Sequence, residues 1–84
     1  DYERFFIYNA VRYHHIISPF TGYPSHQAIS VTVIGDNATV CDGLATALMV
    51  LPRNKADDFM QNFTGYAAML IYEKNGDLLL KRIN

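Results

Sequence analysis

The hydrophobic period of the chain changes at Asp36, and this change constrains the fold more than any other feature. Over Ile29–Gly35, β-branched apolar residues alternate with polar ones, which is typical of a strand with one buried face. After Asp36, apolar residues recur at helical spacing on one stripe, at Val40, Leu44, Leu48 and Leu51. The helix is expected to begin at Asp36 or Asn37 and to end at Leu51, because Pro52 restricts the residue before it.

The N-terminal segment is rich in aromatic and β-branched residues on both sides of Asn9-Ala10. This pattern predicts two antiparallel strands, 1–8 and 11–17, joined by a tight turn at Asn9-Ala10. Residues 18–28 hold two prolines, one glycine and no apolar period, so they are expected to form a loop.

The C-terminal half predicts a second helix and a hairpin. Residues 54–63 favour a short helix with Asn54 as its N-cap. Strands are expected over 67–72 and 77–83, around the turn sequence Asn75-Gly76. The element order β-β-loop-β-α-α-β-β is that of an α+β fold, a largely antiparallel sheet with two helices on one face.

Length and charge set further limits. The chain has 84 residues, enough for one domain of marginal stability. A net charge of −1 argues against a strong non-specific nucleic-acid binder, and a single cysteine excludes a disulfide framework. No apolar run is long enough to span a bilayer. The chain starts without Met, in a strand-like run, so we expect it to be a piece of a longer protein.

Two adjacent histidines, His14 and His15, follow Tyr13 in the second predicted strand. Side chains alternate along a strand, so only one of the two can face a given site. A lone strand histidine is more often a packed sheet residue than a catalyst, so the packed interpretation is favoured before any other information.

Asp42 and Thr46 are four residues apart and therefore share a face of the predicted helix. This face lies opposite the apolar stripe, and Ala38, Ala45 and Met49 are expected on the same side. A carboxylate and a hydroxyl one turn apart suit a hard cation such as Mg²⁺.

On spacing alone, structural interpretations of Asp42 and Thr46 are favoured over a metal site. Thr39 and Asp42 fit a capping box, with Thr39 as the N-cap. Thr46 can donate back to a helix carbonyl. Cys41 has no basic neighbour in the sequence and is interpreted as a small packed residue.

Taken together, these segments resemble one family. Residues 12–24 read RYHHIISPFTGYP and are similar to the pattern R-x-x-H-I-I-D-P-x-T-G-x-P. Residues 41–48 read CDGLATAL and resemble A-D-A-L-A-T-A-L. The order and spacing resemble the C-terminal third of ApbE-type FAD:protein FMN transferases, so residues 1–84 are expected to be the C-terminal part of such a domain.

The resemblance implies an enzyme that binds FAD and Mg²⁺ and transfers FMN to a threonine or serine hydroxyl, releasing AMP. It places the metal ligands at Asp42 and Thr46, the motif histidine at His15, and a FAD-contacting backbone position near Ile17. Ser18 departs from the pattern because it stands where the family has aspartate.

Other departures are Tyr8-Asn9-Ala10, in place of a glycine-containing turn, and Ala45, where some relatives carry a further acidic residue. The implied partners are a redox membrane subunit that accepts the flavin and the N-terminal part of the same protein. The implied location is the periplasmic side of the inner membrane, with a lipid anchor.

Two other classes of function stay open: a catalytically silent flavin- or nucleotide-binding relative, marked by Ser18, and a structural or interaction domain that pairs through its strand edges. We also expect the 84-residue piece, taken alone, to be unstable or to self-associate.

Overall fold

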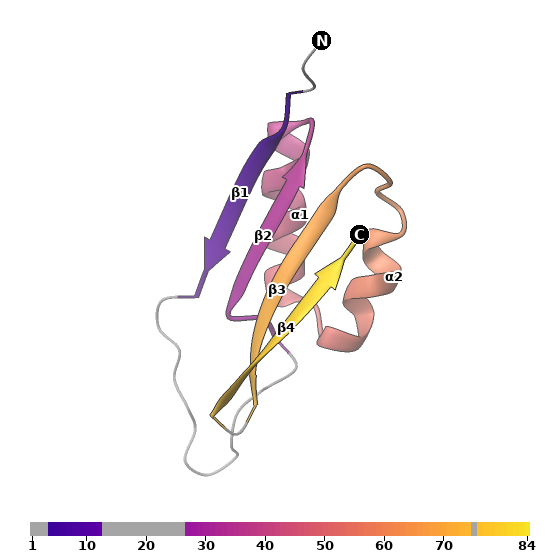
Figure 1. Ribbon diagram of the computed structural model, residues 1–84. Coiled ribbons are helices and arrows are strands. Elements are labelled where there is room, and N and C mark those ends of the chain that lie inside the picture. Colours follow the sequence, from indigo (N-terminus) through magenta and orange to yellow (C-terminus); the bar gives the residue numbers. More distant parts are fainter. Residues whose placement is uncertain (1–3, 13–26, 75) are drawn as a thin grey trace.

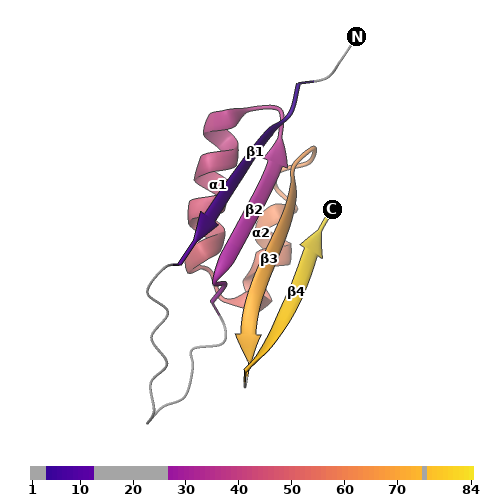
Figure 2. The same cartoon turned by 60° about the vertical axis from the view of Figure 1, so that its left-hand side comes forward.

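The computed structural model describes residues 4–12, 27–74 and 76–84. Its four strands form one antiparallel sheet in the order β1-β2-β3-β4, with bounds β1 Phe6–Val11, β2 Ser30–Gly35, β3 Ala67–Lys74 and β4 Asp77–Ile83. The helical elements are α1 Ala38–Val50, the 3₁₀ turn η1 Arg53–Lys55 and α2 Ala56–Met60. Both α-helices lie behind the sheet in Figure 1, and Figure 2 shows the same two layers from the side. The predicted α+β class and the single helical face are confirmed.

The hairpin predicted at the N-terminus is wrong. β1 runs straight through Asn9 and Ala10 and pairs with β2 along its whole length, from Phe6 opposite Gly35 to Val11 opposite Ser30. The Asn9 side-chain amide donates to Thr32 Oγ1 at 2.6 Å. Cross-strand partners of this kind keep Asn9 extended, although asparagine by itself favours turns. Residues 13–17 of the second predicted strand, and 18–26 of the predicted loop, lie outside the described residues.

The core lies between the sheet and the helices. In β2, Val31 and Val33 are fully buried, which confirms the expected alternation. The remaining buried apolar residues come from both layers and include Leu44, Leu48, Met60, Leu70 and Tyr72. Among the described residues, no helix is long and apolar enough to cross a bilayer.

The buried face of α1 is rotated from the predicted stripe. Its buried residues are Cys41, Leu44, Ala45 and Leu48. Ala45 was expected on the open side with Asp42, but it is fully buried, and Leu51 lies just beyond the helix as its C-cap. The rotation follows from the small residues Cys41 and Ala45, which allow the helix to lie close to β1 and β2.

The second predicted helix, over residues 54–63, is shorter than expected and begins differently. The extended backbone of Pro52 leads into a tight turn in which the Lys55 amide donates to the Pro52 carbonyl at 2.9 Å. Asn54 therefore lies inside η1 and caps nothing. Beyond Met60, the Asn62 side chain donates to the Phe59 carbonyl at 3.1 Å, where the helix ends.

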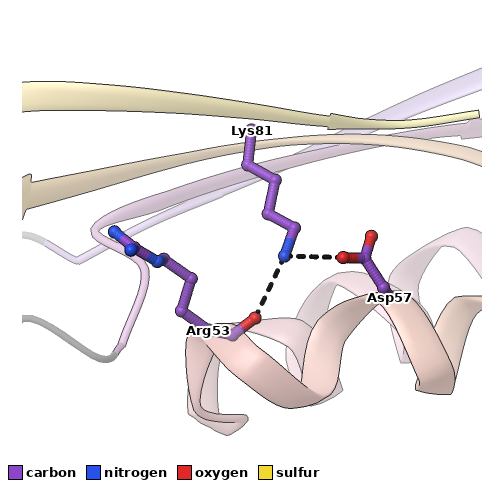
Figure 3. A network of polar contacts seen from close by, with 3 residues as sticks. All are labelled: Arg53, Asp57 and Lys81. Carbon is purple, nitrogen blue, oxygen red and sulfur yellow. Dashed lines mark hydrogen bonds and ion pairs between the residues drawn. The ribbon is translucent and has the colours of Figure 1, made fainter.

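A polar network fastens these helical turns to the last strand. Lys81 of β4 forms an ion pair with Asp57 at 2.9 Å and donates to the Arg53 carbonyl at 3.2 Å (Figure 3). One lysine thus holds both η1 and α2 against the edge strand.

The C-terminal hairpin is confirmed. β3 and β4 pair from Ala68 opposite Ile83 to Lys74 opposite Asp77. Gly76 has a φ of +86°, a backbone conformation that glycine adopts without steric cost. β3 extends two residues beyond the predicted Tyr72.

Candidate functional site

The two predicted metal ligands are both on α1 with exposed side chains. Asp42 and Thr46 lie one helical turn apart on α1. His15, Ile17 and Ser18 fall outside the described residues, so their places relative to this pair remain predictions.

The start of α1 decides between two interpretations of Asp42. Asn37 is the N-cap, and its side-chain oxygen accepts a hydrogen bond from the Val40 amide at 3.0 Å. Thr39 is already inside the helix and Asp42 is beyond its first turn. The capping-box interpretation of Thr39 and Asp42 is therefore wrong, and the Asp42 carboxylate is not used to start the helix.

The Thr46 hydroxyl donates to the Asp42 carbonyl oxygen at 3.0 Å. The expected back-bond of a mid-helix threonine is thus present. A hydroxyl oxygen that donates its proton keeps two lone pairs for acceptance. The hydrogen bond therefore orients the Thr46 oxygen without closing it to a cation.

Tyr8 is a site neighbour that the sequence did not indicate. It pairs with the buried Val33, so its side chain is on the helix side of β1. The pKa of the Tyr8 phenol is raised because the phenol hydrogen-bonds to the Asp42 carboxylate and lies in its negative field. The turn predicted at Asn9-Ala10 did not allow this contact to be foreseen. A continuous strand over residues 6–11 would have placed Tyr8 on the same face of the strand as Ala10.

The C-terminal end of α1 is bound by two side chains from outside the helix. Arg12 donates to the Met49 carbonyl at 2.9 Å, and Gln27 donates to the Val50 carbonyl at 3.2 Å. Carbonyls at a helix C-terminus have no partner within the helix and carry partial negative charge, which favours a guanidinium. Arg12 and Gln27, the described residues on either side of 13–26, therefore both bind the end of α1 that follows Thr46.

Arg12 opens the quoted motif, but the sequence did not indicate this role for it. Arg12 and Met49 are 37 positions apart in the sequence. The sequence pattern does not show that Arg12 lies beside the C-terminal end of α1.

Within the described residues, no group of three or more histidine, cysteine, aspartate or glutamate side chains is arranged to hold a metal ion. Asp42 and Thr46 offer one carboxylate and one hydroxyl, both oxygen donors. This donor set fits a hard cation such as Mg²⁺, which takes few protein ligands and completes its shell with water or phosphate oxygens.

Cys41 is not available for chemistry. It is fully buried, and its thiol donates to the Phe6 carbonyl at 3.7 Å. Burial raises the pKa of the Cys41 thiol, and the nearby charge of Asp36 adds to the shift. The interpretation of Cys41 as a small packed residue is confirmed.

Comparison with known proteins gives a consistent result. A family model described as the ApbE family matches residues 1–70. The chain is 44% identical over 72 residues to a FAD:protein FMN transferase of Treponema pallidum, covering 84% of this chain and 20% of that protein. Proteins of the same name from Vibrio cholerae and Haemophilus influenzae are 48% identical over 52 residues and 36% identical over 77 residues. These alignments cover 61% and 90% of this chain, and 16% and 22% of those two proteins.

The chain thus spans about a fifth of the length of the curated relatives it matches. No solved structure gives a significant match.

Proposed function

This chain belongs to the ApbE family, and from that premise we propose that residues 1–84 are the C-terminal part of a FAD:protein FMN transferase. The observation that carries the proposal is the family match over residues 1–70, which includes both the 12–24 motif and the Asp42–Thr46 pair. Relatives named FAD:protein FMN transferase, at 36–48% identity, support the same activity.

In the proposed reaction, a threonine or serine hydroxyl of a target protein attacks the FMN phosphorus of FAD. The new bond joins that oxygen to phosphorus, the bond from phosphorus to the bridging oxygen breaks, and AMP leaves. Catalysis of phosphoryl transfer depends mainly on alignment and charge neutralisation. Mg²⁺, held by Asp42 and Thr46, would supply that neutralisation at the diphosphate.

His15 is proposed to accept the proton of the attacking hydroxyl, since imidazole titrates near neutral pH. The position of Arg12 supports this role. Its guanidinium is fixed on the Met49 carbonyl, one turn beyond Thr46. His15 is three positions after Arg12, with two residues between them, a stretch that spans roughly 10 Å at most. The backbone near Ile17, further along the same segment, is proposed to contact FAD.

The partners and location are proposed on the same premise. The acceptor is a flavin-carrying subunit of a redox membrane protein, and the N-terminal part of the same protein completes the FAD site. The full-length protein is proposed to act on the periplasmic side of the inner membrane, held by a lipid anchor.

The test uses the full-length protein that contains this chain. Asp42→Ala should lower Mg²⁺-dependent FMN transfer by about 100-fold or more, beyond the roughly 10- to 100-fold loss that outer-shell residues of metal sites give. Asp58→Ala is the matched control, since Asp58 is an exposed aspartate on α2 with no role in the site. Circular dichroism should show that both variants keep the fold.

Wild-type turnover in Asp42→Ala would remove Asp42 from the metal site. If the unmodified protein binds FAD but transfers no FMN, Ser18 marks a silent flavin-binding relative. If it does neither, the chain is an interaction domain.

A further inference from the structure

The sheet has one face that no described helix covers. We call it the outer face; it is the side turned toward the reader in Figure 1. The strand register assigns to it the side chains that alternate with buried Val31, Val33 and Leu70. Of the ten exposed large apolar residues among those described, six lie on this face: Ile7, Val11, Ile34, Met69, Leu78 and Leu80.

The apolar residues extend over all four strands. Ile7 is 71% exposed on one edge strand, and Leu78 and Leu80 are 67% and 65% exposed on the other. Scattered single apolar residues are normal on a surface, but a contiguous apolar face of this width marks an interaction site.

Two polar side chains of the outer face, Asn9 and Thr32, are already paired with each other. Asn9 donates to Thr32 Oγ1 at 2.6 Å and lies 3.4 Å from the Val31 carbonyl. Polar groups with partners of their own can be covered without the cost of leaving them unsatisfied. The part of the outer face around Asn9 and Thr32 can therefore be buried without leaving these two side chains unsatisfied.

The outer face also has a hollow of about 330 Å³ where β2 and β4 end. Its lining includes the apolar side chains of Ile34 and Met69 and the charged side chain of Arg82. Such a hollow suits an apolar anchor side chain from the covering layer, because anchors in desolvated pockets carry most of the energy of an interface.

We propose that the remainder of the full-length flavin transferase packs on the outer face as a second layer, so that the sheet lies between it and the helices. This inference rests on the proposed function. The length of the curated relatives indicates what covers the outer face. The region that this chain matches is about a fifth of one polypeptide in those relatives. A small unit whose described helices leave one apolar face of the sheet uncovered, within a chain about five times longer, is expected to have its covering layer in the same molecule.

Photo-crosslinking in the full-length protein tests this surface. The photoreactive residue p-benzoylphenylalanine replaces Leu80 on the outer face in one variant. In the control it replaces Val50, which is similarly exposed, at 62%, but lies at the end of α1. Position 80 should give crosslinks within one chain to peptides outside residues 1–84, in higher yield than position 50.

Three results would overturn the proposal: crosslinks of doubled mass, which indicate a second copy; no crosslink at position 80; and equal yields at the two positions.

A thermal measurement adds an independent readout. Leu80→Lys should lower the melting temperature of the full-length protein by about 4 °C or more, whereas Val50→Lys should leave it nearly unchanged. Equal shifts would contradict the proposal.

The failure of this inference is distinguishable from the failure of the proposed function. FMN transfer is measured in the unlabelled protein, and crosslinking is measured without FAD. Crosslinks without FMN transfer would contradict the proposed function and support the proposed contact at the outer face. FMN transfer without crosslinks would support the function and contradict the contact.

Discussion

Gly35, the last residue of β2, lies directly beneath the ring of Tyr66. A Cβ atom at this position would overlap the ring carbons of Tyr66. The Tyr66 hydroxyl donates to Asp36 at 3.0 Å, so the ring is held where it is. Gly35 is thus needed for close approach and not for an unusual backbone angle.

Gly35→Ala should lower the free energy of unfolding by about 1–3 kcal/mol, as overpacking of a filled site does. Gly43→Ala is the matched control, because a Cβ at Gly43 meets nothing within 4 Å. Gly43 lies inside α1, so alanine there should raise stability by about 1 kcal/mol. Urea denaturation of the full-length variants measures both; effects of the same sign would refute this account of Gly35.

Cys41 gives a second prediction at the scale of one residue. Because burial raises the pKa of its thiol, the thiolate fraction at pH 8 is smaller than for a free cysteine. Iodoacetamide should therefore label Cys41 slowly in the folded protein and at the ordinary rate in denaturant, as followed by peptide mass spectrometry. Rapid labelling of the folded protein would contradict the buried position of Cys41.

At the scale of elements, α1 is held at both ends by side chains that are not part of it. Asn37 satisfies an amide at the N-terminus, and Arg12 and Gln27 satisfy carbonyls at the C-terminus. The helix that carries Asp42 and Thr46 is consequently fixed relative to Arg12 and Gln27, the described residues on either side of 13–26.

Two neighbouring substitutions test how α1 begins. Asn37→Ala should cost about 1 kcal/mol of unfolding free energy, because the Val40 amide loses its acceptor. Thr39→Ala should cost nothing, and can gain a few tenths of a kcal/mol, since Thr39 is an exposed residue inside the helix. Thermal unfolding measures both variants. A larger loss of unfolding free energy for Thr39→Ala than for Asn37→Ala would support the capping-box interpretation.

At the scale of the whole molecule, the described residues form two layers, and none of the described helices covers the outer face of the sheet. The core lies between the sheet and the helices, and each of the four strands contributes at least one exposed large apolar residue to the outer face. A domain of this size buries only about 60% of the surface that its unfolded chain exposes, so an additional bare face is costly.

The isolated 84-residue chain should therefore associate or unfold at low temperature. Sedimentation velocity and thermal melts over a tenfold range of concentration measure this. A monomer with a sharp melt that does not depend on concentration would show that the two layers are sufficient without a third.

How much of the fold and of the candidate site could be predicted depends on how far apart in the sequence the interacting residues lie. Strand β2, the β3–β4 hairpin and the extent of α1 follow from patterns within a few residues, and the structure confirms them. Asn9-Ala10 and Asn54 show the opposite case. Both have turn or cap preferences by themselves, but strand pairing and the tight turn after Pro52 overrode those preferences.

The sequence alone determined the class of the fold, the family, and the residues proposed for metal and flavin, because these depend on local period and on motifs in fixed order. Only the tertiary structure decided which side of α1 is buried, that Tyr8 lies against Asp42, and that Arg12 binds the end of α1. These contacts join residues 34 to 37 positions apart, and a pattern read along one segment carries no information about the segment that packs on it.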